Sequence, residues 1–167
     1  MSSSLFLLLP LALGLAAVQA AWIGRISLWG GRADLVLVGL LLLATQTGRA
    51  RASLLALIVA PFADSAAGLP LGASILPLLA AIYLTGLGER VLFGFRLGWP
   101  ILVTLIATLL AGTITLAQLQ LLGWPVAWGD RLLHNLLPSA LLNGMLMLAL
   151  FLLLNLLGRR RLRDFTT

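Results

Sequence analysis

The chain has 167 residues, of which 61% are hydrophobic and 10% are charged, and its mean hydropathy is +1.10. A soluble domain of this length could not cover so much apolar side chain with so little polar surface, so we expect one membrane-embedded domain over residues 1–167. The formal net charge is +6, but the basic residues, all arginines, lie in short gaps between apolar runs, which argues against a nucleic-acid-binding domain. The absence of cysteine excludes disulfides and thiol chemistry.

Six apolar segments follow one another along the chain and predict an all-α integral membrane protein with six transmembrane helices. They cover residues 5–22, 35–47, 52–66, 72–87, 101–122 and 132–157. The last two exceed the roughly 20 residues that cross a bilayer core. The second to fourth are short, so they require a thinner bilayer, irregular ends or shielding by neighbouring helices.

The first segment leaves two questions open. Its end, Ala17 to Ala21, has the small residues of a signal-peptidase site, but the preceding N-terminus lacks the Lys or Arg that a signal peptide carries. Its small residues also recur at every fourth position, which either allows another helix to approach closely or only reflects how common alanine is. These residues are Ala12, Ala16, Ala20 and Gly24.

The distribution of arginines predicts the orientation of the protein in the membrane. If all six segments cross, eight arginines fall on the side of the termini and three fall on the other side, namely Arg25, Arg32 and Arg131. Because positive charge is retained on the cytoplasmic side, both termini are expected in the cytoplasm.

The stretch from Ala60 to Gly72 interrupts the apolar pattern with one carboxylate, two prolines and two glycines, and predicts a hairpin between the third and fourth segments. Asp64 has three interpretations: an acceptor that holds the turn, a contact to a partner, or a proton or ion relay. Gly68 and Gly72 predict a tight reversal and a close contact between helices.

Polar residues are few inside the fifth and sixth segments, and interhelical hydrogen bonds account for them. They form one face in each segment: Thr104, Thr108 and Thr115 in the fifth, and Asn135, Ser139 and Asn143 in the sixth. The single histidine, His134, and the scattered acidic residues do not form the clusters that metals require. The sequence therefore predicts no metal, no cofactor and no enzymatic activity.

The order and spacing of Asp64, Gly68, Leu71–Gly72 and Tyr83 resemble the rod shape-determining protein family MreD. The last segment agrees, since it carries Asn143 in "LLNGMLMLALFLLL" and ends in a basic tail. The chain departs from the family before the aspartate, where Ala60 and Pro61 stand in place of a frequent glycine. The resemblance covers essentially the whole chain, and Asp64, Gly68, Gly72, Tyr83 and Asn143 are its candidate structural or partner-contact residues.

This resemblance implies a fold similar to the S components of energy-coupling-factor transporters. It also implies a non-enzymatic scaffold of the bacterial elongation machinery in the cytoplasmic (inner) membrane, which supports lateral peptidoglycan synthesis and cell shape. The implied partners are membrane lipid and an MreC-like bitopic protein, with MreB, RodA and a class B penicillin-binding protein in the same assembly. The alternative is a vitamin-binding S component, which uses a small-residue surface such as the first segment offers to meet its coupling subunit.

Overall fold

The computed structural model describes residues 29–86 and 98–163, with side chains up to Leu156, and eight single positions between Pro10 and Ser27. Within these parts the chain consists of helices, turns and loops, without a β-strand. The predicted all-α class is therefore confirmed for the described residues.

The helices follow the predicted segments closely. They are α2 (Leu35–Thr47), α3 (Arg49–Ala67), α4 (Ile75–Leu84), α5 (Gly98–Leu121), α6 (Trp128–Asp130), the π-helix η2 (Arg131–Leu136) and α7 (Leu137–Arg163). Elements α6, η2 and α7 run on without a break and form the sixth predicted segment. Most of the first segment lies outside the described residues.

Three stretches among the described residues are long and apolar enough to cross a membrane: Arg49–Ala67, Gly98–Leu121 and Trp128–Leu156. Helix α2 has 13 residues and α4 has 10. At 1.5 Å per residue they are about 20 and 15 Å long, which is less than the roughly 30 Å of a hydrocarbon core. The part of the chain that the structure describes therefore has the character of a membrane protein with three helices long enough to span, and the six spans that the sequence predicts are not confirmed.

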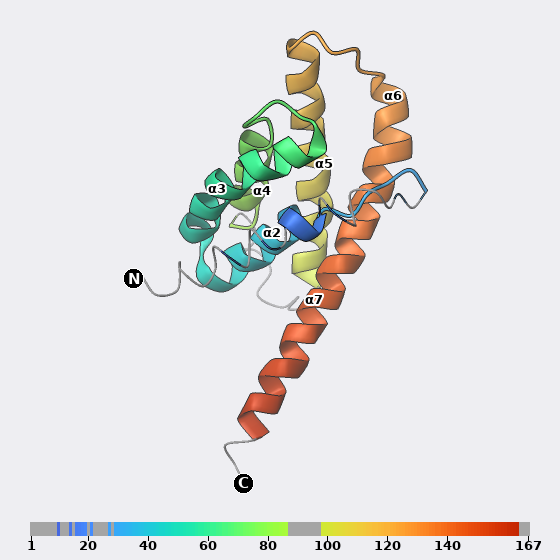
Figure 1. Cartoon of the computed structure of the whole chain (residues 1–167). Helices are drawn as coiled ribbons and strands as arrows, with labels where there is room; N and C mark the ends of the chain where they lie inside the picture. The colour runs from blue at the N-terminus through green and yellow to red at the C-terminus, as the bar shows by residue number, and fades with distance from the viewer. Residues whose placement is uncertain are drawn as a thin grey trace.

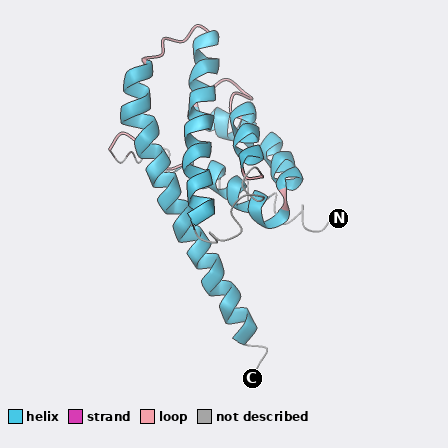
Figure 2. Ribbon diagram, turned by 180° about the vertical axis from the view of Figure 1, so that it is seen from behind, coloured by secondary structure: helices cyan, strands magenta, loops and turns pink. Residues whose placement is uncertain are grey.

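Helices α5 and α7 form a tall antiparallel pair, and the shorter α2, α3 and α4 pack beside it (Figure 1). The same pairing is visible from behind, where α7 continues beyond the other helices toward the C-terminus (Figure 2). A single residue, Gly48, links α2 to α3 at a φ of 95°, which only glycine adopts readily. This link makes α2 and α3 antiparallel neighbours.

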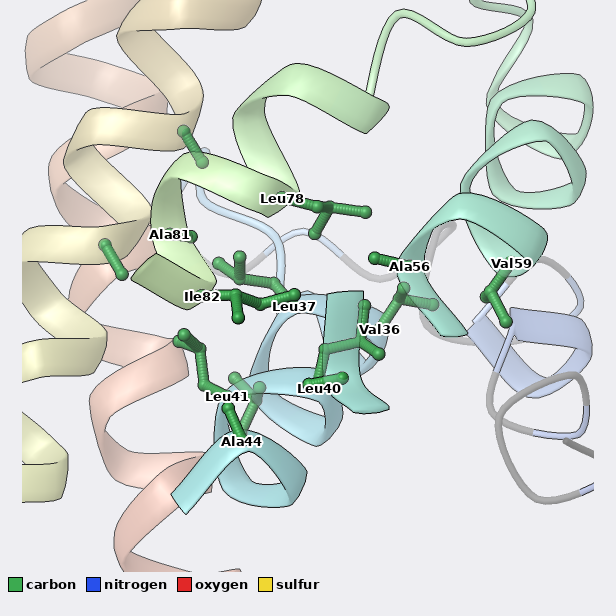
Figure 3. Close-up of a cluster of buried hydrophobic side chains, with 14 of the residues drawn as sticks. Val36, Leu37, Leu40, Leu41, Ala44, Ala56, Val59, Leu78, Ala81 and Ile82 are labelled. Carbon is green, nitrogen blue, oxygen red and sulfur yellow. The ribbon is translucent and has the colours of Figure 1, made fainter. Parts of the chain in front are cut away.

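The apolar core lies where α2 meets α3 and α4 (Figure 3). Leu41, Leu55 and Ile82 are almost fully buried there. Alanines fill the positions between them and are buried as completely, for example Ala56 and Ala81. Small side chains let these helices approach closely, and dispersion contacts of this kind hold helices together in lipid.

The π-helical turn η2 stands directly before the only proline within α7, Pro138. Proline has no N–H to donate to the carbonyl four residues earlier, so the carbonyl of His134 loses its usual partner. Wider π-helical turns occur where the regular helical ladder is interrupted in this way. Residues 30 and 31, which precede α2, lie against the chain at this interruption and are described with the candidate site below.

Candidate functional site

Asp64 is completely buried at the end of α3, and it holds the turn to α4. Its Oδ2 accepts hydrogen bonds from the backbone N–H of Gly72, at 2.8 Å, and of Ser74, at 3.2 Å. Its Oδ1 accepts the hydroxyl of Ser74. Both oxygens are thus occupied by donors of the following turn, which agrees with the interpretation of Asp64 as a turn acceptor.

Gly68 and Gly72 shape the same turn through their backbone conformation. Their φ angles are 69° and 86°, in the left-handed region that favours glycine. A Cβ at Gly68 would meet no atom within 4 Å, and one at Gly72 would meet only a methyl of Ile75 at 3.5 Å. The predicted tight reversal is present, but the predicted close helix contact is not found among the described residues, because none of them brings its backbone within 4 Å of a Cβ at these glycines.

The other two residues of the resemblance lie apart from this turn. Tyr83 is near the opposite end of α4, with 61% of its surface exposed. Asn143 is 1% exposed on α7, inside the bundle. The five candidate residues therefore form one turn, one surface position and one buried position rather than a single site.

The residues that sequence reasoning missed form an extended segment, residues 30–34, which we call the strap. It leads into α2 and packs against α7, which the blue trace crosses in Figure 1. Glycines allow this contact, because a Cβ at Gly31 would lie 2.5 Å from the backbone nitrogen of Ser139, and one at Gly30 would collide with the carbonyl of His134. The strap thus lies on the backbone of α7 where Pro138 interrupts it.

The polar face of α7 binds every second residue of the strap. Ser139 Oγ accepts the N–H of Arg32 at 2.9 Å, and Asn143 Oδ1 accepts the N–H of Asp34 at 2.7 Å. With its amide turned to donate, Asn135 reaches the carbonyl of Gly30 at 3.0 Å. The predicted polar face of the sixth segment is therefore a row of partners for an extended backbone.

The periods of the two segments explain why this row fits. Two residues of an extended chain advance about 6.6 Å, and four residues of an α-helix advance about 6 Å. Positions 30, 32 and 34 therefore keep step with positions 135, 139 and 143. The sequence contains both parts of this contact, namely the polar residues at spacings of four and the glycine pair at residues 30–31. It did not show that the polar residues bind the segment that begins with this pair.

The strap lies deep along the spanning helix, since Asn143 is roughly midway between Trp128 and Leu156. Non-helical backbone at this depth is tolerated only where protein or a water-filled cavity satisfies its polar groups. Asn143 also donates to the hydroxyl of Thr108 on α5, at 3.2 Å. It therefore joins the strap, α7 and α5, and confirms the predicted interhelical hydrogen bonds for Asn143 and Thr108. The hydroxyls of Thr104 and Thr115 instead donate within α5.

Asp34 ends the strap and caps α2 by accepting the N–H of Leu37 at 2.9 Å. Gln19, from the first segment, accepts the N–H of Val36 at 2.9 Å on the same helix end. Asp34 and Gln19 together therefore satisfy two of the free N–H groups at the start of α2.

A cavity of about 510 Å³ lies between the strap, the turn after α3 and the middle of α5 and α7. Its polar lining comprises Gln19, Arg32, Asp34, Ser74, Thr108, Thr115, Ser139 and Asn143. Its apolar lining includes small residues from the first segment, α3 and α5: Ala16, Ala63, Ala66, Ala67, Ala111 and Gly112. This is the candidate functional site, and its volume lies within the range of about 300–1,000 Å³ typical of small-molecule sites.

The small-residue face of the first segment is described at one position, Ala16, which is 6% exposed and belongs to the core of this chain. The other three positions, Ala12, Ala20 and Gly24, lie outside the described residues. At Ala16, therefore, the small side chain serves packing within the protein.

The only histidine, His134, pairs with Asp130 at 3.0 Å, and both side chains are largely exposed. Among the described residues, no three His, Cys, Asp or Glu side chains gather closely enough to hold a metal ion. The candidate site thus offers hydrogen bonds and two charges, which suit the binding of a polar molecule.

A comparison with protein-family models gave no match for this chain, and comparisons with curated proteins and with solved structures gave no significant match. The geometry of the described residues is therefore the basis for the proposals that follow.

Proposed function

We propose that this chain is a non-enzymatic membrane scaffold of the bacterial rod-shape machinery, a member of the MreD family with an S-component-like fold. The observation that carries the proposal is the Asp64 turn. The spaced residues of the resemblance, Asp64, Gly68 and Gly72, act as one structural unit in which all carboxylate oxygens have donors. A carboxylate occupied in this way serves the architecture rather than acid–base chemistry.

Tyr83 is the proposed partner contact of this scaffold. It is 61% exposed on α4, the short helix that follows the turn. Aromatic residues with a polar tip are enriched at protein interfaces and often carry much of the binding energy. The proposed partner is an MreC-like bitopic protein, in an assembly with MreB, RodA and a class B penicillin-binding protein.

The proposed setting is the bacterial cytoplasmic membrane, with both termini in the cytoplasm and the loop at residues 122–127 outside. Reporter fusions at both ends and in that loop test this orientation. A C-terminus outside the cytoplasm would place the Asp64 turn on the cytoplasmic side and contradict the proposed topology.

Co-purification from the native host in mild detergent tests the scaffold proposal. We expect an MreC-like protein with the wild-type chain, and we expect Tyr83→Ala to weaken its recovery. Leu76→Ala is the matched control, because Leu76 is similarly exposed on the same helix, at 56%. Recovery of transporter ATPase subunits in place of an MreC-like protein would contradict the scaffold and support the alternative.

The second candidate function is a small-molecule-binding subunit of a transporter, such as an S component for a vitamin. One observation favours it, namely the cavity of about 510 Å³ with Arg32 and Asp34 in its lining. The burial of Ala16 in the core offers no support for the first segment as a docking surface at that position. The co-purification above distinguishes the two candidates.

A further inference from the structure

Small side chains line much of the cavity between the strap and the α5–α7 pair. In a chain dominated by leucine, its lining carries alanine at positions from α3 and α5, including Ala66 and Ala111, with Gly112 beside them. A leucine at Ala66 or Ala111 would occupy part of the volume. The cavity is also lined by two oppositely charged residues, which are costly inside a membrane protein unless they are paired or used.

The hydroxyl groups of the lining already donate hydrogen bonds to other groups of the protein. Each donates to a protein acceptor: Ser74 to Asp64, Thr108 to Thr104, Thr115 to Ala111, and Ser139 to Asn135. A hydroxyl that donates elsewhere presents only lone pairs. Together with the carboxylate of Asp34, these oxygens favour a ligand that brings N–H or O–H donors.

The donors that remain for a ligand are few and well placed. Asn143 has two amide N–H bonds, and Thr108 is the one described partner that accepts from them. Its side chain is nevertheless 1% exposed and lines the cavity, so its second N–H is available inside. Arg32 is an exposed residue of the lining that supplies a permanent positive charge, and no described carboxylate forms an ion pair with it.

The two charged residues of the lining are close to each other along the backbone of the strap. Arg32 and Asp34 are two residues apart on the strap, whose last residue has extended backbone angles of −112° and 93°. Residues i and i+2 of an extended segment project to the same side, about 7 Å apart. The cavity therefore presents one positive and one negative group at a separation that a single small molecule can span.

We infer that this cavity binds a small zwitterion, with its anionic group on Arg32 and its ammonium group facing Asp34 and the threonine oxygens. The inference shares one assumption with the second candidate function, namely that the cavity binds a small molecule. It does not depend on the scaffold proposal, because a scaffold can also carry a ligand. Failure to recover an MreC-like partner therefore leaves it intact, and the binding experiment below tests it separately.

The probe is 5-aminopentanoate, an ω-amino acid with its two charges separated by a flexible chain. Pentanoate and pentylamine are matched probes that carry one charge each. Binding is measured by titration calorimetry with the full chain in lipid nanodiscs. We expect the zwitterion to bind at least tenfold more tightly than either single-charge probe, because each charge-assisted hydrogen bond contributes a factor of this size.

Two variants and their controls locate the binding. Arg32→Gln removes the cation, and Ala66→Leu fills the cavity; each should weaken 5-aminopentanoate binding at least tenfold. Arg131→Gln and Ala50→Leu make the same changes at exposed positions outside the lining and should bind normally. Thermal melting of all four variants identifies any that fail to fold.

Three results would overturn the inference. One is the absence of binding of any probe to the folded wild-type chain. Another is equal affinity for pentanoate, pentylamine and the zwitterion, which would mean that the cavity does not use its paired charges. The third is unchanged binding by folded Arg32→Gln and Ala66→Leu, which would place the zwitterion elsewhere on the protein.

Discussion

Replacement of Gly31 by alanine should detach the strap from α7 and destabilise the protein. An added Cβ would lie 2.5 Å from the backbone nitrogen of Ser139 and 2.6 Å from the carbonyl carbon of Pro138. These are backbone atoms of a long helix, which cannot move aside as the end of a side chain can. Ordinary contact begins near 3.4 Å, so the strap must move by about 1 Å.

The magnitude follows from what this movement breaks. Overpacking of a tight contact typically costs about 1–3 kcal/mol. The displacement also disrupts the two bonds from the strap to α7, which join the N–H groups of Arg32 and Asp34 to Ser139 and Asn143. Interhelical hydrogen bonds in membrane proteins average about 0.6 kcal/mol each, so the expected loss of unfolding free energy is about 2–4 kcal/mol.

Reversible unfolding in mixed micelles, followed by circular dichroism, measures this loss. Amide exchange of the peptide over residues 30–37 measures detachment directly, and protection should fall at Arg32 and Asp34. Gly129→Ala is the matched control, because Gly129 is helical and a Cβ there meets nothing within 4 Å. Alanine in that helix should be neutral or stabilise by up to about 1 kcal/mol.

The reasoning would be refuted if Gly31→Ala were as stable as Gly129→Ala and kept full amide protection over the strap. Such a result would mean that residues 30–34 do not lie on the backbone of α7. A loss of stability with full protection would instead place the strain outside the strap, which the geometry does not predict.

Four further changes have expected outcomes. Asp64→Ala should lower the unfolding free energy more than Asp64→Asn in the same micelle assay. Asparagine still accepts backbone N–H groups and can donate to Ser74, whereas alanine leaves buried donors without partners. Equal losses for the two variants would contradict the role of Asp64 in the turn. Gly72→Leu should cost about 1–3 kcal/mol and complement rod shape less well than Asp64→Asn, because its φ of 86° strains any larger residue. Asp34→Ala should lower the melting temperature, because the N–H of Leu37 at the start of α2 loses its acceptor, and an unchanged melting temperature would contradict this cap. Gly112→Ala should lower the melting temperature, because its Cβ would collide with a leucine of η2, and an unchanged melting temperature would contradict this contact.

The sequence by itself determined the class of the protein and the position of its helices. Apolar composition required a membrane-like environment, and the predicted segment 35–47 coincides with α2. The role of Asp64 was also accessible, because a carboxylate followed by two glycines within eight residues is a local pattern. Helix propensity, hydropathy and turn chemistry act between residues close in the chain, and so they can be read from it.

The sequence did not separate the two possible reasons for a glycine, its own backbone conformation and the close approach of a neighbour. Gly72 is required by its own φ, whereas Gly31 is required by the backbone of Pro138 and Ser139, more than 100 residues away in the chain. Both are simply glycines in the sequence. Only the fold separates a conformational requirement from a steric one.

The candidate site was decided by the tertiary structure for the same reason. The sequence showed a polar face at Asn135, Ser139 and Asn143, but its partner is an extended segment that precedes α2. In the sequence Arg32 is only one of three arginines on the side away from the termini, and the strap places it, with Asp34, in the lining of a cavity beside α5 and α7. Contacts between distant segments depend on the packing of the whole bundle, and local patterns along a chain do not contain that information.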